Sequence, residues 1–194
     1  MHRFSLHTLP ARPWKNGGGT AREITVIPRG SSWADFTWRV SVAEIAQSGP
    51  FSSFPGIDRQ ILLLDGAGVR LQAAAGLDQD AIDHRLDEPL VPFAFAGEAA
   101  ITATLLDGPS RDLNVMTRRG VVRSEVQVAR SDFAAAACDG LVLLAVRGTW
   151  EGAGAEPVSL AAGEGAVLPE GTAGLRLEAV EAGGALVAVQ ILRW

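Results

Sequence analysis

Short apolar segments, β-branched or alternating, follow one another along most of the chain, and turn-forming residues such as Asp65-Gly66 and Asp139-Gly140 end them. Segments of this length and composition are typical of strands, and their spacing predicts an all-β sandwich or barrel. Only residues 131–137 and, more weakly, 42–47 favour a helix. The predicted strands are residues 37–42, 59–64, 68–71, 100–106, 121–128, 141–146, 165–168, 174–180 and 186–192.

Two of these segments resemble each other. Residues 59–66 read Arg-Gln-Ile-Leu-Leu-Leu-Asp-Gly, and residues 141–148 read Leu-Val-Leu-Leu-Ala-Val-Arg-Gly. A short strand, a polar excursion and a further pair of strands follow each of them, which indicates a duplicated β unit. We therefore expect two halves, 1–125 and 126–194, that share an apolar interface in one compact unit, because either half alone offers only a marginal core.

The second copy contains a turn that resembles the turn of a cupin jelly roll. Gly163, Pro169 and Gly171 have its spacing, in which glycines permit a tight corner and proline precedes the next strand. Metal-binding cupins place a histidine where this chain has Gly174. Residues 92–97 hold the matching position in the first copy, also without histidine. The sequence thus predicts an all-β double cupin, two jelly-roll β-barrels in one chain, with a degenerate C-terminal half.

Charge, histidine content and hydropathy limit the partners. A net charge of -5 argues against nucleic acid, and no apolar run is long enough to span a membrane. The N-terminus lacks the apolar core of a secretion signal and the single cysteine, Cys138, fits a reducing compartment, so we expect a cytoplasmic protein. His2 and His7 lie near a terminus, and His84 lies in an acidic segment expected to be an exposed loop. No metal and no other cofactor are therefore expected.

Four motifs contain most of the polar side chains that could bind a small molecule. The first, residues 13–24, has three consecutive glycines, which suit either a flexible hairpin or backbone N–H groups that cradle an anion. It includes Lys15, the only lysine of the chain. In the second, residues 38–43, Arg39 and Ser41 share one face of a strand. That face could point outward to solvent or inward, where the arginine would recognise a carboxylate.

The third motif is a rigid turn that ends in adjacent Asp58 and Arg59, which point to opposite sides of an extended strand. One would orient the pocket while the other braces the scaffold. In the fourth motif, alternation places Asp112, Asn114 and Met116 on one face. The predicted ligand-binding residues are Lys15, Asn16, Arg22, Glu23, Arg39, Ser41, Phe54, Asp58, Arg59, Asn114 and Met116.

Together the four motifs resemble the HutD/Ves family. The shared pattern is a Trp-Lys-Asn-Gly-rich opening that ends in Arg-Glu-Ile, a Trp-Arg-x-Ser strand, a Gly-Pro-Phe-Ser-x-Phe-Pro-Gly-x-Asp-Arg turn and an Asp-x-Asn-x-Met-x-Arg-Arg segment. The resemblance covers residues 10–120. One position departs from the pattern, because the family has threonine directly before the first-motif arginine, whereas this chain has Ala21 there and Thr20 one residue earlier.

The resemblance implies a bicupin associated with histidine utilisation, whose members moderate pathway expression by sensing an intermediate such as urocanate or formylglutamate. It implies no demonstrated reaction, and the sequence offers no nucleophile with its base and no paired acid and base. We therefore expect a binding protein whose arginines pair with the carboxylate of a small metabolite. Two alternatives stay open: a metal-independent cupin isomerase or hydrolase using Asp58, Glu23 or Lys15 as acid or base, and a protein-interaction module with an exposed apolar patch. A homodimer also stays open.

Overall fold

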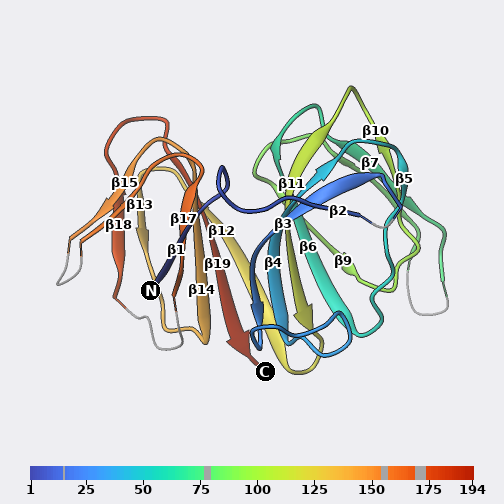
Figure 1. Ribbon diagram of the computed structural model, residues 1–194, viewed down its shortest axis with the longest axis horizontal. Coiled ribbons are helices and arrows are strands. Elements are labelled where there is room, and N and C mark those ends of the chain that lie inside the picture. The colour runs from blue at the N-terminus through green and yellow to red at the C-terminus, as the bar shows by residue number, and fades with distance from the viewer. Residues whose placement is uncertain (15, 77–79, 154–156, 169–173) are drawn as a thin grey trace. The chain divides into compact units, whose positions relative to one another are not determined.

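The computed structural model describes residues 1–14, 16–76, 80–153, 157–168 and 174–194 (Figure 1). In these residues every regular element is a β-strand, and none of them forms a helix long and apolar enough to cross a membrane. The chain divides into two compact units. The first unit is Pro10–Val121, and the second unit combines Met1–Leu9 with Val122–Trp194.

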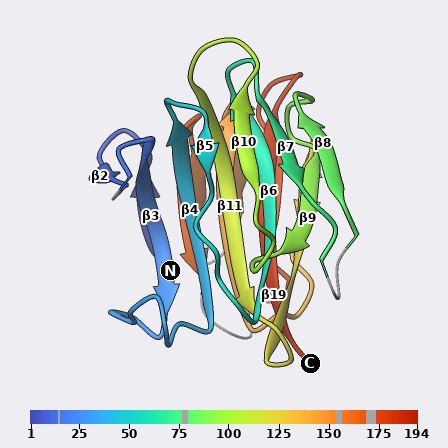
Figure 2. The ribbon, with the colours of Figure 1, turned by 90° about the vertical axis from the view of Figure 1, so that its right-hand side faces the viewer.

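The strands of the first unit are β2 (Arg12–Pro13), β3 (Gly19–Ile27), β4 (Trp38–Ile45), β5 (Gly49–Pro50), β6 (Ile57–Asp65), β7 (Val69–Ala73), β8 (Ile82–Leu86), β9 (Pro92–Ala96), β10 (Thr102–Leu105) and β11 (Ser110–Arg118). They form a sheet in the order β2-β3-β4-β11-β6-β9 and a smaller sheet in the order β5-β10-β7-β8. Figure 2 shows β3, β4, β11 and β6 of the larger sheet side by side.

The strands of the second unit are β1 (His2–Ser5), β12 (Val122–Ala129), β13 (Asp132–Ala134), β14 (Gly140–Arg147), β15 (Trp150–Gly152), β16 (Val158–Leu160), β17 (Glu164–Leu168), β18 (Arg176–Ala179) and β19 (Ala185–Arg193). Their sheets have the orders β1-β17-β14-β19-β12 and β13-β18-β15-β16. The core of this unit is mostly apolar, and Trp150, Leu141 and Leu177 in it are fully buried. Gln190, which lies opposite Leu141, is a buried polar residue on the same face.

The first nine residues belong to the second unit, which differs from the sequence-based halves 1–125 and 126–194. The reason is that β1 pairs antiparallel with β17, with Phe4 opposite Gly165. A Cβ atom on Gly165 would lie 2.2 Å from the Phe4 ring, so only glycine lets the two strands approach this closely. A four-residue strand with one buried side chain gives too weak a periodic signal to be recognised from sequence.

The strand order reveals the internal duplication. In the larger sheet of the first unit, β4-β11-β6-β9 has the counterpart β12-β19-β14-β17, and β5-β10-β7-β8 has the counterpart β13-β18-β15-β16. Every strand number rises by eight from one copy to the other. The sequence repeat is thereby confirmed, because residues 59–66 include most of β6 and residues 141–148 include most of its counterpart β14.

The registers of the two copies also match residue by residue. The β11·β6 ladder shifts between Arg111 and Asp112, and the β14·β19 ladder shifts at the equivalent place, between Ala145 and Arg147. An irregularity in the same position fixes which residues correspond. The alignment pairs Arg59 with Leu141, Asp112 with Leu186, and Asn114 with Ala188.

Both helix predictions are wrong. Residues 42–45 continue β4, which is hydrogen-bonded to β3 on one side and β11 on the other, so the two ladders override a weak local preference. Residues 132–134 form β13, where Phe133 pairs with Leu177 and is almost fully buried. The alanine-rich composition of residues 134–137 favoured a helix locally, but burial of Phe133 in the core outweighs that preference.

The predicted cupin turn is described only in part, because Pro169 and Gly171 lie outside the described residues. Gly163 and Gly174, at its two ends, have φ of 84° and 83°. These values lie in the left-handed region that favours glycine. The segment expected to be an exposed loop around His84 is instead strand β8, because apolar Ile82 and Leu86 alternate with polar neighbours and face the core.

Candidate functional site

The larger sheet of the first unit turns six of the predicted residues to the same face. In one row across the strands, Glu23 lies opposite Ser41, and Ser41 lies opposite Asn114. In the next row Arg39 and Arg59 both lie opposite Met116. Side chains alternate along a strand, so both rows point to the side that carries the unit's buried apolar cluster. The inward face therefore combines apolar residues with Glu23, Arg39, Ser41, Arg59, Asn114 and Met116.

Arg59 is the most deeply buried cation of this face, with 7% of the residue exposed. Its Nε and Nη2 atoms donate hydrogen bonds to Asn114 Oδ1 at 3.3 and 3.2 Å. The aromatic rings of Phe51, Phe54 and Phe95 surround the guanidinium, with centroids 4.9 to 5.7 Å from its central carbon. Burial lowers the pKa of Arg59 to about 10, so the side chain stays charged at neutral pH.

Arg39 is held on two sides. Its Nε atom lies 2.9 Å from Glu23 Oε2 in an ion pair, and the face of its guanidinium lies 3.7 Å from the ring centroid of Trp33. Burial lowers the pKa of Arg39, the charge of Glu23 opposes this shift, and the positive charge of Arg12 adds to it. Arg12, Arg39 and Arg59 therefore concentrate positive charge on the inward face.

Asp112 belongs to the same face but was absent from the predicted set. It lies opposite Ala43 and Leu63, it is 4% exposed, and its Oδ2 atom accepts no hydrogen bond from the described residues. Burial raises the pKa of this carboxyl to about 7, although Arg59 draws it down. Its alternation with Asn114 and Met116 was a sufficient sequence signal. The sequence contains no such signal for Trp33 or Arg12, because neither residue belongs to an alternating pattern.

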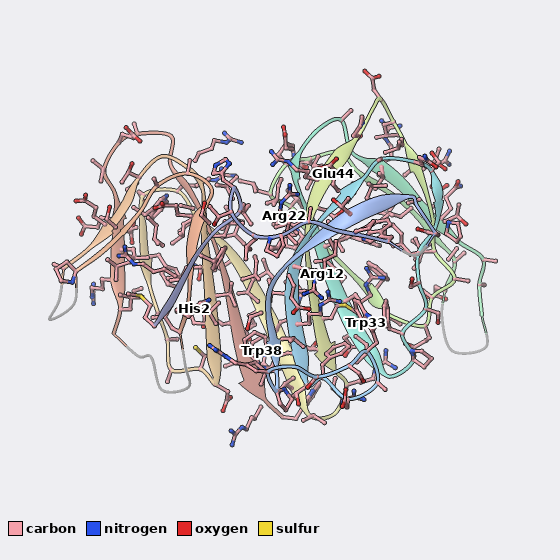
Figure 3. The ribbon with its side chains drawn as sticks, viewed as in Figure 1. His2, Arg12, Arg22, Trp33, Trp38 and Glu44 are labelled. Atoms are coloured by element: carbon pink, nitrogen blue, oxygen red, sulfur yellow. The ribbon has the colours of Figure 1, made fainter. Side chains whose placement is uncertain are left out.

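The remaining predicted residues do not join the inward face. Arg22, labelled in Figure 3, lies opposite Val42 and therefore points to the other side of the sheet. Asp58 lies opposite Thr117 and points to that side as well. Asp58 and Arg59 thus point to opposite sides of the strand, as expected, and Asp58 accepts a hydrogen bond from Arg119 Nε at 2.7 Å. Asn16 is exposed, and its Oδ1 atom accepts a hydrogen bond from the Gly18 amide at 3.1 Å. Lys15 lies outside the described residues.

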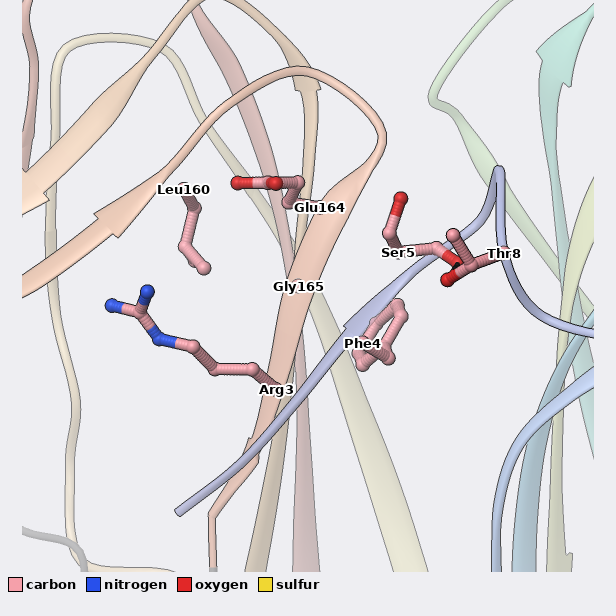
Figure 4. A pocket seen from close by; sticks show the side chains of 7 residues that line it. All are labelled: Arg3, Phe4, Ser5, Thr8, Leu160, Glu164 and Gly165. Carbon is pink, nitrogen blue, oxygen red and sulfur yellow. Dashed lines mark hydrogen bonds between the residues drawn. The ribbon is translucent and has the colours of Figure 1, made fainter.

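The first unit also has a pocket of about 330 Å³ beside the arginines, lined by Trp33, Ala34, Ser53, Phe54, Pro55, Ile57 and Arg118. Phe54, a predicted site residue, is half-buried here and contacts both Trp33 and Arg59. The second unit has a pocket of about 270 Å³ next to β1 (Figure 4), lined by Arg3, Phe4, Ser5, Thr8, Leu160, Glu164 and Gly165. None of the predicted residues lines the latter, so we place the candidate site in the first unit.

The duplicated unit shows what the inward face contains without these polar groups. Leu141 and Leu186 stand where the first unit has Arg59 and Asp112, and Ala188 stands in place of Asn114. All three are fully buried in the apolar core of the second unit. The jelly roll therefore folds without the polar residues, and their burial in the first unit needs a reason other than architecture.

No three His, Cys, Asp or Glu side chains gather into a metal-binding group among the described residues. His84 faces inward but stacks on Phe93 with 3.8 Å between ring centroids. We expect elemental analysis of protein purified without an affinity tag to find far less than one metal ion per chain, because two or three converging imidazoles are missing. Near-stoichiometric iron, zinc or nickel would contradict this expectation.

Solved structures place the chain among the double cupins. It aligns over 98% of its length with 98% of a conserved protein of unknown function from Pseudomonas aeruginosa PAO1, at 31% identity and a TM-score of 0.84. It aligns over its full length with 98% of HutD from Pseudomonas fluorescens SBW25, at 27% identity and a TM-score of 0.81. Lactobacillus farciminis oxalate decarboxylase shares the fold at 9% identity, with a TM-score of 0.66 over 97% of this chain and 85% of that chain. These relatives and the two jelly rolls make the protein a bicupin.

The family follows from sequence. The HutD family model matches residues 6–187. Protein Ves of Citrobacter koseri is 40% identical over 152 residues, which cover 78% of this chain and 75% of that protein. Protein Ves of Escherichia fergusonii is 36% identical over the same coverage. The chain belongs to the HutD family, as its motifs indicated, and this membership indicates a role related to histidine utilisation.

Proposed function

We propose that the first unit binds a small carboxylate on its inward face, that the ligand is a histidine-catabolism intermediate such as urocanate or formylglutamate, and that binding moderates histidine utilisation. The observation that carries this proposal is the environment of Arg59. Within the described residues its guanidinium donates hydrogen bonds only to the neutral amide of Asn114, and it forms no ion pair.

A buried guanidinium that no carboxylate contacts destabilises a folded protein, because the charge of Asp112, which acts on Arg59 without an ion pair, offsets its desolvation only in part. The second unit has Leu141 at the matching position, so the fold does not require this charge. A ligand carboxylate would supply the missing anion and accept charge-assisted hydrogen bonds. Arg39 lies in the same row of the sheet as Arg59, and Met116 lies on the strand between them. At the usual strand spacing the two arginine positions are about 10 Å apart.

Thermal unfolding with urocanate or formylglutamate tests the proposal. A ligand that binds only the folded state at a hundred times its Kd should raise the free energy of unfolding by about 2.7 kcal/mol. The methyl ester of urocanate is the matched control, because it keeps the ring and removes the charge that the arginines would bind. Equal stabilisation by acid and ester, or none by either pathway acid, would exclude the proposed site.

NMR spectra of the same protein–metabolite mixtures distinguish a binding protein from the enzyme alternative. Two of its acid–base candidates have other contacts, since Asp58 pairs with Arg119 and Glu23 pairs with Arg39. We therefore expect NMR spectra of either metabolite to stay unchanged after prolonged incubation with the protein. Conversion of the ligand would favour the isomerase or hydrolase instead.

A further inference from the structure

We propose that Asp112 is a further ligand-binding residue of this site, which meets the ligand carboxylate as a neutral acid and donates its proton to it in a hydrogen bond. Binding above neutral pH then takes up a proton from the solvent. The inference rests on the proposed function, because it concerns the carboxylate ligand of the same inward face. It adds a second donor beside Arg59 and makes the affinity for the ligand depend on pH.

The carboxyl of Asp112 is buried and incompletely satisfied. Only 4% of the residue is exposed, and its Oδ2 atom has no hydrogen-bond partner among the described residues. The residues opposite it on the two flanking strands, Ala43 and Leu63, have apolar side chains. The duplicated unit has Leu186 at this position, so the jelly roll does not need the carboxyl. A buried oxygen without a partner destabilises the unliganded protein, and a ligand that contacts it would remove this effect.

The position of Asp112 brings it close to a carboxylate bound by Arg59. Arg59 lies opposite Met116, and its guanidinium reaches along the sheet to Asn114 Oδ1. Asp112 is the next inward residue of β11 in that direction, about 7 Å further along the strand. Arg59 and Asp112 form no ion pair within the described part of the chain, although each charge acts on the other. A carboxylate that accepts from the remaining donors of Arg59 can therefore also contact Asp112.

Two carboxyl groups beside one buried guanidinium tend to keep one proton between them. Burial raises the pKa of Asp112 to about 7, while the charge of Arg59 lowers it. A ligand anion bound to Arg59 neutralises that positive charge and adds a negative one, and both changes raise the pKa of Asp112 further. Asp112 is then a neutral acid in the complex, and its O–H group can donate to the ligand carboxylate.

The affinity for the ligand should therefore fall as the pH rises above 7. At pH 6 most of the unliganded protein already holds the proton on Asp112, so binding takes up almost none. At pH 8 the unliganded carboxyl is mostly ionised and the complex must gain a proton, so the Kd should be about tenfold higher than at pH 6. Arg59, with a pKa of about 10, stays charged at both pH values.

The other groups that face the interior of the first unit need a control. Further charged side chains on the inward face of the larger sheet are Arg39, Arg12 and Glu23. His84 faces inward from β8 of the smaller sheet, opposite the buried Leu71. All of these groups are kept in Asp112→Asn, so a pH dependence that comes from any of them survives in this variant.

Calorimetry with N-formylglutamate tests the inference, because this ligand has no group that titrates between pH 6 and 8. Measured in two buffers of different ionisation enthalpy, the native protein should take up about 0.8 of a proton per ligand at pH 8 and about 0.1 at pH 6. Asp112→Asn should take up none and should bind equally tightly at both pH values. Asp132→Asn, which changes an exposed aspartate of the second unit, should keep the native proton uptake.

A second substitution separates the hydrogen bond from the titration. Asp112→Leu removes both the titrating group and the donor, whereas the amide of Asp112→Asn can still donate to a carboxylate. A hydrogen bond to a charged group stabilises a complex more than a neutral one does, so Asp112→Asn should bind at least about tenfold more tightly than Asp112→Leu.

The outcomes distinguish the inference from the proposed function. Binding without proton uptake at pH 8, or uptake that survives in Asp112→Asn, would overturn the role of Asp112 and leave carboxylate binding intact. Equal affinities of Asp112→Asn and Asp112→Leu would show that this residue does not contact the ligand. Absence of binding by the native protein at both pH values would remove the proposed function itself. The proton uptake of the native protein decides the matter even where a variant does not fold.

Discussion

Arg59→Leu should weaken binding of a pathway carboxylate by about ten- to a hundredfold, because one charge-assisted arginine contact contributes about 1.5–3 kcal/mol. Replacing Arg59 and Asp112 together with leucine should leave the unliganded protein as stable as before, or more stable by up to about 2 kcal/mol, because replacing both buried ionic partners with apolar side chains is often neutral or stabilising. Leucine is the residue that the duplicated unit carries at both positions. Calorimetry of the single variant and denaturant unfolding of the double variant measure the two effects.

Two variants complete this experiment. Arg39→Ala should also weaken binding by about tenfold or more, since Arg39 shares the inward face. Arg176→Ala is the matched control, because Arg176 is an exposed arginine of the second unit and should not affect binding. A loss of affinity in Arg176→Ala equal to that in Arg59→Leu would be incompatible with the site. A strongly destabilised Arg59→Leu that still binds would mean that Arg59 is structural.

Asp112 should make the protein less stable as the pH rises from 4 to 7. The pKa of this carboxyl is raised from its ordinary value of 3.8 to about 7 by burial. Below pH 4 both the folded and the unfolded state hold the proton, and the group has no effect. Between pH 4 and 7 the unfolded state releases the proton first, so the free energy of unfolding falls, by about 4 kcal/mol in total.

Asp112→Asn removes the titrating group at almost constant volume and therefore isolates this effect. The variant should match the native protein near pH 4 and exceed its stability by several kcal/mol at pH 8, as measured by denaturant unfolding. Other charged groups on the inward face are Arg59, Arg39, Arg12 and Glu23, and their contributions largely cancel in the difference between the two proteins. A difference that does not change between pH 4 and 8 would show that Asp112 is not buried as a neutral acid.

The fold was predictable where periodicity is strong. Every strand inferred from alternating or continuous apolar residues is present, and the repeat of residues 59–66 in residues 141–148 led to the duplicated jelly roll. The two wrong helix predictions have a common cause. Helix preference at residues 42–47 and 131–137 is local, whereas the pairing that overrides it joins residues far apart in sequence, such as Phe133 and Leu177.

Residues that share a face of the sheet were predictable where a motif follows the alternation of a strand. Arg39 with Ser41, and Asn114 with Met116, were each placed on one face by alternation, but the register that brings these faces together is a tertiary property. Arg22 illustrates the limit. The pairing of β3 with β4 shifts by one residue between Glu23 and Thr25, and this shift decides that Glu23 faces inward while Arg22 faces the other side. The composition of the segment does not reveal such a bulge.

The pairing of β1 with β17 has a consequence for synthesis on the ribosome. All strands of the first unit emerge without interruption, so that unit can fold as soon as its last strand is available. The opening residues, by contrast, must wait until nearly the whole chain has been translated before Glu164–Leu168 exists to receive them. An unpaired strand that waits is exposed to the edges of other nascent chains. Polar His2 and Arg3, with Phe4 as the only buried side chain, make this waiting segment a poor nucleus for aggregation.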